Sequence, residues 1–131
     1  MTIELMMLVC SVALLLVLIA VQAFAGVRAQ GLPAMAGSRD NLPAPTPFQS
    51  RTKRVVDNHR EGLALFTPLI LVAAVAHIST PWTVIGAQLF FYARVAHAAL
   101  YLAGVPWVRP LAWGAGIAGT IVVFTALVAN A

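Results

Sequence analysis

Four long apolar stretches, separated by shorter polar or turn-forming connections, account for most of the chain. Each stretch is close to the ~20 residues that an α-helix needs to cross the hydrocarbon core of a bilayer. The pattern therefore predicts an all-α membrane protein, a four-transmembrane-helix bundle that forms a single domain over residues 1–131. The predicted helices span residues 5–28, 51–78, 82–103 and 107–130.

The helix predicted over residues 51–78 begins with a strongly polar segment, residues 51–61, which runs directly into apolar sequence. On a helix, Arg51, Arg54, Asn58 and Glu61 are spaced three or four residues apart, so they lie on one stripe. Polar side chains that descend into a membrane segment are costly unless they have partners or a ligand. We therefore expect the functional site here.

The helix predicted over residues 82–103 carries Arg94, His97 and Tyr101 on one face. It is antiparallel to the preceding helix, and in the expected register Glu61 and Arg94 reach a similar depth, with Asn58 beside His97. A lone charge at mid-membrane costs ~2.5–3.5 kcal/mol on insertion scales. We therefore predict a Glu61–Arg94 ion pair, within one subunit or across an interface, at the floor of a polar cleft.

A simpler interpretation is that this ion pair only fixes the register of two helices, since structural ion pairs also occur. The two stripes carry more polar groups than are needed to fix the register of two helices, and this favours a binding cleft. His59 and His77 are interpreted as structural, because His59 lies off the stripe and His77 ends its helix. The histidines lack a matching cysteine or carboxylate spacing, so no metal centre is predicted.

The composition supports membrane insertion, because 61% of the residues are hydrophobic and only 9% are charged. Most basic residues fall in or beside the first and third connections, which predicts that residues 28–54 are cytoplasmic and both termini are outside. We therefore interpret the net charge of +4 as a result of membrane topology and contact with lipid headgroups, and not as a surface that binds nucleic acid.

Residues 23–25 resemble a signal-peptidase site, but the first residues lack a positive region, so we expect a transmembrane helix. Residues 30–50, rich in Pro and Gly, are expected to be irregular.

Two motifs resemble the MAPEG family, the membrane-associated proteins in eicosanoid and glutathione metabolism. One is Arg51-x-x-Arg54-x-x-x-Asn58-x-x-Glu61, and the other runs over residues 90–97 (Phe-Phe-Tyr-Ala-Arg-Val-Ala-His) and 101–104 (Tyr-Leu-Ala-Gly). The resemblance covers nearly the whole chain. It implies a homotrimer that binds glutathione between its subunits near the cytoplasmic side, and a bacterial-type member in the inner membrane.

The resemblance also gives the motif residues roles toward glutathione as co-substrate. Arg54, Asn58 and Glu61 would bind the backbone and the charged ends of glutathione. His97 and Tyr101 would line the same site.

Three arginines complete the implied site. Arg94 would buttress Glu61, and Arg28, at the end of the first helix, would approach from the neighbouring subunit. Arg109 falls near the thiolate-stabilising arginine of the family, which makes it the candidate catalytic residue. A guanidinium suits this role because it stays charged and favours the thiolate over the thiol.

The chain departs from the family pattern at Asp57, Pro110 and Trp113, and these departures argue against a prostaglandin isomerase. The first hypothesis is a glutathione-dependent transferase or peroxidase that acts on lipophilic electrophiles or lipid hydroperoxides. The alternative is a non-catalytic MAPEG-like protein that binds a lipid or small molecule, or an accessory subunit of a membrane complex. A small four-helix exporter fits poorly, because Glu4 lies at the end of its helix rather than at mid-membrane.

Overall fold

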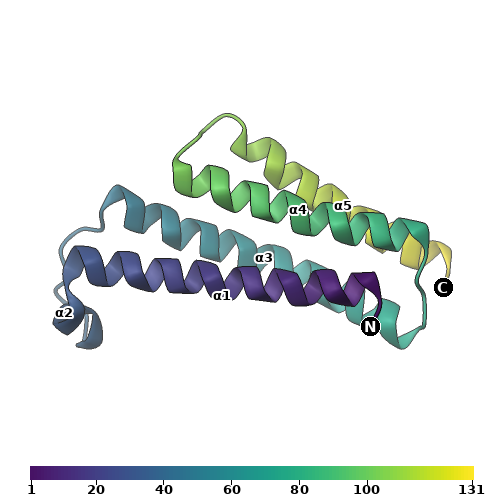
Figure 1. Cartoon of the computed structure of the whole chain (residues 1–131), viewed down its shortest axis with the longest axis horizontal. Helices are drawn as coiled ribbons and strands as arrows, with labels where there is room; N and C mark the ends of the chain where they lie inside the picture. Colours follow the sequence, from purple (N-terminus) through teal and green to yellow (C-terminus); the bar gives the residue numbers. More distant parts are fainter.

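The structure, a computed structural model, describes all residues 1–131 and consists of helices without strands. Four of the helices are long, and they lie side by side in alternating directions (Figure 1). Both termini and the α3–α4 connection lie at one end of the bundle, which we call the Glu4 end; the other two connections lie at the Arg109 end. The elements are α1 (Ile3–Gln30), α2 (Leu32–Ala36), α3 (Pro47–Val75), α4 (Pro81–Ala103) and α5 (Arg109–Ala129).

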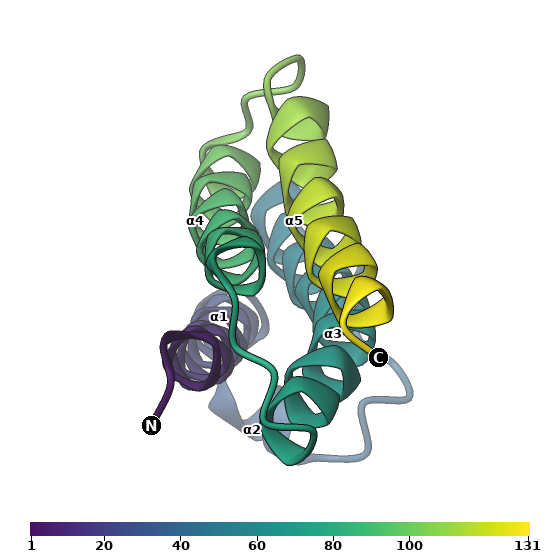
Figure 2. The same ribbon diagram turned by 90° about the vertical axis from the view of Figure 1, so that its right-hand side faces the viewer.

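Two of the four long helices, α1 and α5, are apolar and long enough to cross a membrane. Seen along the bundle, α1 and α5 occupy opposite corners and make no contact with each other (Figure 2). Helices α3 and α4, which carry the polar motifs, therefore form the other diagonal. That all four helices span the membrane stays a prediction.

The helix bounds differ from the predicted ones where local capping decides them. Helix α3 begins at Pro47 rather than near residue 51, because Thr46 and Gln49 form a capping box and Pro47 suits the first helical position. It ends at Val75 rather than at 78, and His77 then adopts a left-handed conformation with φ of 56°. The connection after α1 is only partly irregular, because it contains α2.

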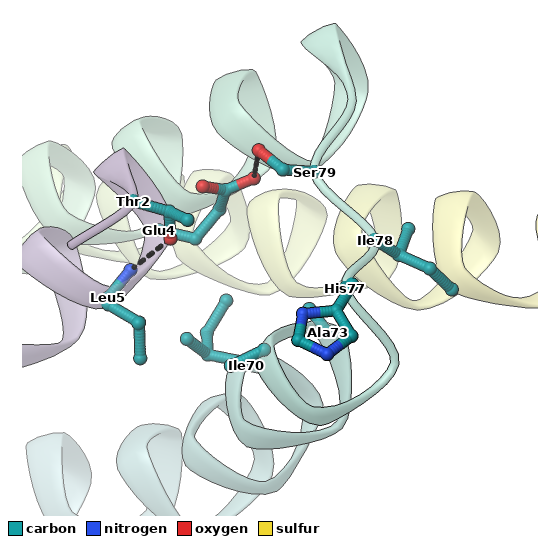
Figure 3. Close-up of a pocket in the computed structure, with 9 residues that line it drawn as sticks. Thr2, Glu4, Leu5, Ile70, Ala73, His77, Ile78 and Ser79 are labelled. Atoms are coloured by element: carbon teal, nitrogen blue, oxygen red, sulfur yellow. Dashed lines mark hydrogen bonds between the residues drawn. The ribbon is translucent and has the colours of Figure 1, made fainter.

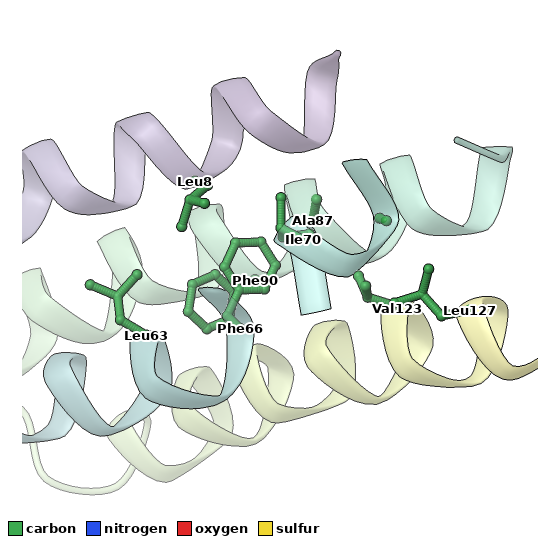
Figure 4. Packing of buried hydrophobic residues seen from close by; sticks show 9 residues of the cluster. Leu8, Leu63, Phe66, Ile70, Ala87, Phe90, Val123 and Leu127 are labelled. Atoms are coloured by element: carbon green, nitrogen blue, oxygen red, sulfur yellow. The ribbon is translucent and has the colours of Figure 1, made fainter. Parts of the chain in front are cut away.

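The core lies midway along the bundle, where α3 and α4 meet. The rings of Phe66 and Phe90 stack with their centroids 3.9 Å apart and an interplanar angle of 10°. Leu8 of α1 and Val123 of α5 belong to the same buried hydrophobic cluster, so all four long helices contribute to the core (Figure 4). Helices α4 and α5 approach closely because Gly119 lies against the backbone of Phe90, where a Cβ atom would come within 2.6 Å of the Phe90 nitrogen.

Candidate functional site

Arg94 is the centre of the polar region between α3, α4 and α5, and only 2% of it is exposed. Its guanidinium lies against Gly62, where a Cβ atom would overlap it, and its Nε lies 3.4 Å from where a Cβ of Gly116 would be. Its Nη1 donates a hydrogen bond of 2.7 Å to Oδ1 of Asn58. The Cζ atom stands 5.5 Å from the centre of the Phe90 ring, within the range of a cation–π contact. Gly62 therefore makes room for a buried cation, whereas a Cβ at Gly116 would be in ordinary contact with it.

The predicted Glu61–Arg94 ion pair does not form within the single chain. Arg94 bonds to Asn58 instead, and Glu61 is exposed. The reason is the rotation of α3 about its axis, which turns Asn58 and Gly62 toward α4 and leaves Glu61 on the outer flank. The ion pairs that do form join Asp57 to Lys53 at 2.7 Å and to Arg60 at 3.7 Å. The same Glu61–Arg94 pair across an interface stays a prediction.

Arg109, Tyr101 and His97 form a continuous stack from the start of α5 into the bundle. The Arg109 Cζ atom lies 4.4 Å from the centre of the Tyr101 ring, a cation–π contact. The Tyr101 ring meets the His97 ring edge-on, with centroids 5.4 Å apart and an angle of 64°. His97 is 3% exposed, so the stack connects a half-buried arginine to a buried imidazole. The structure thus brings together three residues that the sequence places on two different helices.

Arg51 links the beginning of α3 to the turn between α4 and α5. Its Nη1 atom lies 2.7 Å from the position that a Cβ of Gly104 would occupy. Gly104 ends α4 in a left-handed conformation with φ of 77°, which favours glycine. The start of the first motif and the end of the second are therefore neighbours at the Arg109 end.

The remaining predicted site residues point away from this region of the single chain. Arg54 and Glu61 are exposed on the flank of α3, and Arg28 is exposed at the end of α1. None of the three forms a hydrogen bond or ion pair within the chain. They are available to a ligand or to a second subunit.

His59 is a buried core residue, in keeping with the expectation that it lies off the polar stripe and is structural. It is 2% exposed, and its Nε2 is 2.8 Å from the backbone oxygen of Ser11 on α1. Its Nδ1 has no partner. The signal was present in the sequence, because His59 follows Val55 and Val56 and precedes Leu63 at the spacing of one helix face.

Sequence reasoning also missed the role of Glu4, which it treated only as the end of a helix. Glu4 is 2% exposed and accepts hydrogen bonds from the hydroxyls of Thr83, at 2.6 Å, and Ser79, at 2.9 Å. It therefore ties α1 to the beginning of α4 at the end of the bundle opposite Arg109.

Comparison with known proteins gives one match. The model of the MAPEG family matches residues 5–129 of the chain. A search of curated proteins and a search of solved structures each found no match.

Proposed function

The chain belongs to the MAPEG family, whose members include glutathione-dependent transferases and non-catalytic proteins, and we propose that it is a glutathione-dependent membrane transferase or peroxidase. Its substrates would be lipophilic electrophiles or lipid hydroperoxides. The observation that carries this proposal is the Arg109–Tyr101–His97 stack, which holds a permanent cation beside a hydrogen-bonding surface. An anionic thiolate is the group that such a cation favours.

We propose that the site is completed by a second subunit of a homotrimer. Arg54 and Glu61 carry opposite charges and are exposed on the flank of α3. Unpaired charges that face lipid are costly, whereas a neighbouring subunit and a bound peptide would give both of them partners. Arg28, exposed at the end of α1 near the same end of the bundle, is the candidate contribution from the neighbour.

The residues suit the charged ends of glutathione. Arg54 matches a carboxylate, and Glu61 matches the amino group, so the two would fix opposite charges of the tripeptide. Asn58 offers its amide nitrogen, because its oxygen already accepts from Arg94. His97 and Tyr101 would line the site, while Arg94 would set the position of Asn58 and, across an interface, buttress Glu61.

Arg109 would then act on the sulfur. As a guanidinium it stays protonated at neutral pH and lowers the free energy of the thiolate relative to the thiol. The thiol proton passes to water, the thiolate attacks the electrophilic carbon, and a C–S bond forms as the bond to the leaving group breaks; the released or newly formed anion then takes a proton from water. With a lipid hydroperoxide the thiolate would attack the terminal oxygen and break the O–O bond, and a second glutathione would reduce the resulting sulfenic acid, which gives the alcohol, water and glutathione disulfide. Holding the thiolate at the edge of the bilayer brings it to a substrate dissolved in lipid.

The protein is an integral membrane protein by its family and its apolar helices. We further propose a bacterial inner membrane location with four spans, both termini outside and the Arg109 end at the cytoplasmic face. The concentration of basic residues at that end supports this orientation.

A specific observation also favours the non-catalytic alternative, a MAPEG-like binding protein or an accessory subunit. Asn58 is engaged with Arg94, and Arg109 faces a tyrosine ring. Both contacts are ones that a purely structural arrangement would also make.

A rate measurement separates the two functions. The protein in nanodiscs is given reduced glutathione and a lipophilic model electrophile, and the rate of conjugation is measured. Arg109→Ala is expected to lower the rate at neutral pH by at least about tenfold, because a nearby guanidinium shifts a thiol by one or more pKa units. Arg60→Ala, which removes an exposed arginine outside the proposed site, is expected to leave the rate unchanged. Equal rates for wild type and Arg109→Ala would contradict the catalytic role.

A further inference from the structure

A groove of about 290 Å³ lies between α1 and the segment that follows it, in the half of α1 nearer the Arg109 end. We call it the α1–α2 groove. It is lined by Ile19, Gln22, Ala23 and Val27 of α1, by Met35 of α2 and by Arg39. Its apolar α1 residues are exposed on a helix that is long and apolar enough to cross a membrane, so the groove faces lipid. Its volume is that of about ten water molecules at ~30 Å³ each, which is room for a segment of an acyl chain.

The groove follows from the way the chain turns after α1. Gly31 ends α1 with φ of 86°, a value that favours glycine, and α2 begins at the next residue. Met35 of α2 lies on Gly26 of α1, where a Cβ atom would come within 2.7 Å of the Met35 Cε. Arg39 has φ of 63°, uncommon for a residue with a Cβ, and its Nε donates a hydrogen bond of 2.7 Å to the Met35 oxygen. The fold thus holds a cation at the groove.

The two polar side chains of the groove have hydrogen-bonding groups that the chain does not use. Arg39 is exposed and forms no ion pair, not even with the adjacent Asp40, so both of its Nη atoms are free. Gln22 is half-buried, and its amide makes no hydrogen bond within the chain. A polar group without a partner is unfavourable in an apolar environment. Because neither side chain is enclosed, a molecule in the groove can reach both.

The cavity at the Glu4 end differs in this respect (Figure 3). Its carboxylate, that of Glu4, accepts hydrogen bonds from Ser79 and Thr83 and lies beside the starts of α1 and α4. Helix N-termini favour a negative charge, so the fold itself stabilises this carboxylate. The charge of Arg39, in contrast, has no partner in the chain.

We propose that the α1–α2 groove binds one anionic phospholipid, with the Arg39 guanidinium on the phosphate and an acyl chain along Ile19 and Ala23. A guanidinium binds phosphate well, because its N–H donors form parallel, charge-assisted hydrogen bonds. Basic pockets beside membrane helices suit the headgroups of anionic lipids for the same reason. The Gln22 amide would donate to an ester carbonyl of the same lipid.

The charges near the groove favour an anionic headgroup over a zwitterionic one. Residues 28–54 carry one acidic side chain, Asp40, and an excess of basic ones, namely Arg28, Arg39, Arg51, Lys53 and Arg54. The choline or ethanolamine group of a zwitterionic lipid has a positive charge of its own, which this segment repels. The net charge of a phosphatidylglycerol headgroup is negative, so it is attracted instead.

A second copy of the chain fits the groove less well than a lipid does. Arg28 is the α1 residue that we propose to reach a neighbouring subunit. It comes nine residues after Ile19, about two and a half turns at 3.6 residues per turn, and therefore lies on the opposite side of α1. The groove thus faces away from the proposed contact.

The test uses the full-length protein purified in detergent, with equal amounts of phosphatidylglycerol and phosphatidylcholine added. Native mass spectrometry measures how much of each lipid stays bound. Phosphatidylglycerol is expected to be retained at least about tenfold more strongly, because only its headgroup carries a net charge opposite to that of Arg39. Glycerol phosphate, which has the phosphate without the acyl chains, is expected not to displace the lipid at equal concentration.

Two variants test the cation and the space. Arg39→Gln is expected to weaken retention of phosphatidylglycerol by at least about tenfold, since the charge-assisted hydrogen bonds are lost. Its matched control is Lys53→Gln, which removes the same charge outside the groove and is expected to bind like wild type. Ala23→Phe fills the groove, leaves Arg39 in place and is expected to abolish the preference, whereas Ala13→Phe, elsewhere on α1, is not. All four positions are exposed, so the variants are expected to fold.

The proposal is overturned if phosphatidylcholine is retained as well as phosphatidylglycerol, or if glycerol phosphate displaces the lipid at equal concentration. Retention like wild type by Arg39→Gln or by Ala23→Phe has the same consequence. A change of oligomeric state in Ala23→Phe, read from the same spectra, would also overturn it, because the groove would then be a contact between subunits. No residue of the groove is assigned to glutathione, so each of these outcomes leaves the proposed function untouched.

Discussion

At the scale of single residues, the buried cation Arg94 depends on a glycine that faces it. A Cβ atom on Gly62 would overlap the guanidinium, whereas a Cβ on Gly114 would meet nothing within 4 Å. The sequence indicates that Arg94 needs a polar partner, because an isolated charge in an apolar helix is costly. It does not indicate that the partner within the chain is Asn58 rather than Glu61. The choice between Asn58 and Glu61 depends on the rotation of α3 about its axis and on how far the long Arg94 side chain reaches.

Gly62→Ala is accordingly expected to lower the free energy of unfolding by about 1–3 kcal/mol, because the new methyl group displaces Arg94 from its packed position. Thermal unfolding of the purified protein in nanodiscs measures this. Gly114→Ala is the matched control and is expected to be neutral or stabilising by up to ~1 kcal/mol, as alanine favours helix. Equal effects of the two substitutions would show that Arg94 does not require the space at Gly62.

At the scale of elements, the existence and order of the four long helices could be predicted from apolar runs and short connections. The depth pairing of α3 and α4 follows from the fixed rise of a helix, and Arg94 does lie against Gly62, the neighbour of Glu61. The rotation of α3 about its axis could not be predicted. It is set by packing against α1, which is apolar on nearly every side and therefore gives no sign of which face is buried. For the same reason the role of Glu4 was missed.

The end of α3 carries a strained position that a substitution can relieve. His77 adopts φ of 56° just after the helix, and Ile78 N donates to the Ala73 oxygen at 2.9 Å, as in a glycine-terminated helix. His77→Gly is expected to raise the free energy of unfolding by about 0.5–1 kcal/mol, since glycine accepts positive φ without a Cβ clash. His77→Ala keeps the clash and controls for loss of the imidazole. A gain with alanine as large as with glycine would argue that backbone strain is not the cause.

At the scale of the whole molecule, membership of the MAPEG family follows from a match over residues 5–129, as the two motifs predicted. The two ends of the bundle are chemically distinct, with arginines and the aromatic stack at one end and the Glu4 cavity at the other (Figure 1). The exposed charges of Arg54 and Glu61 find no partner within one chain. If, as we propose, the site is shared between subunits, it cannot be assembled from a single chain, because the partners of these charges would lie on another copy.

Thermal unfolding in nanodiscs with increasing reduced glutathione tests whether the Arg109 end binds glutathione. Wild type is expected to gain ~2.7 kcal/mol when glutathione reaches 100 times its dissociation constant, because the ligand binds only the folded protein. Arg54→Ala is expected to lose most of this gain, whereas Arg60→Ala, an exposed arginine of the same helix, is expected to retain it. No shift in wild type at millimolar glutathione, or an undiminished shift in Arg54→Ala, would contradict glutathione binding at this end of the bundle.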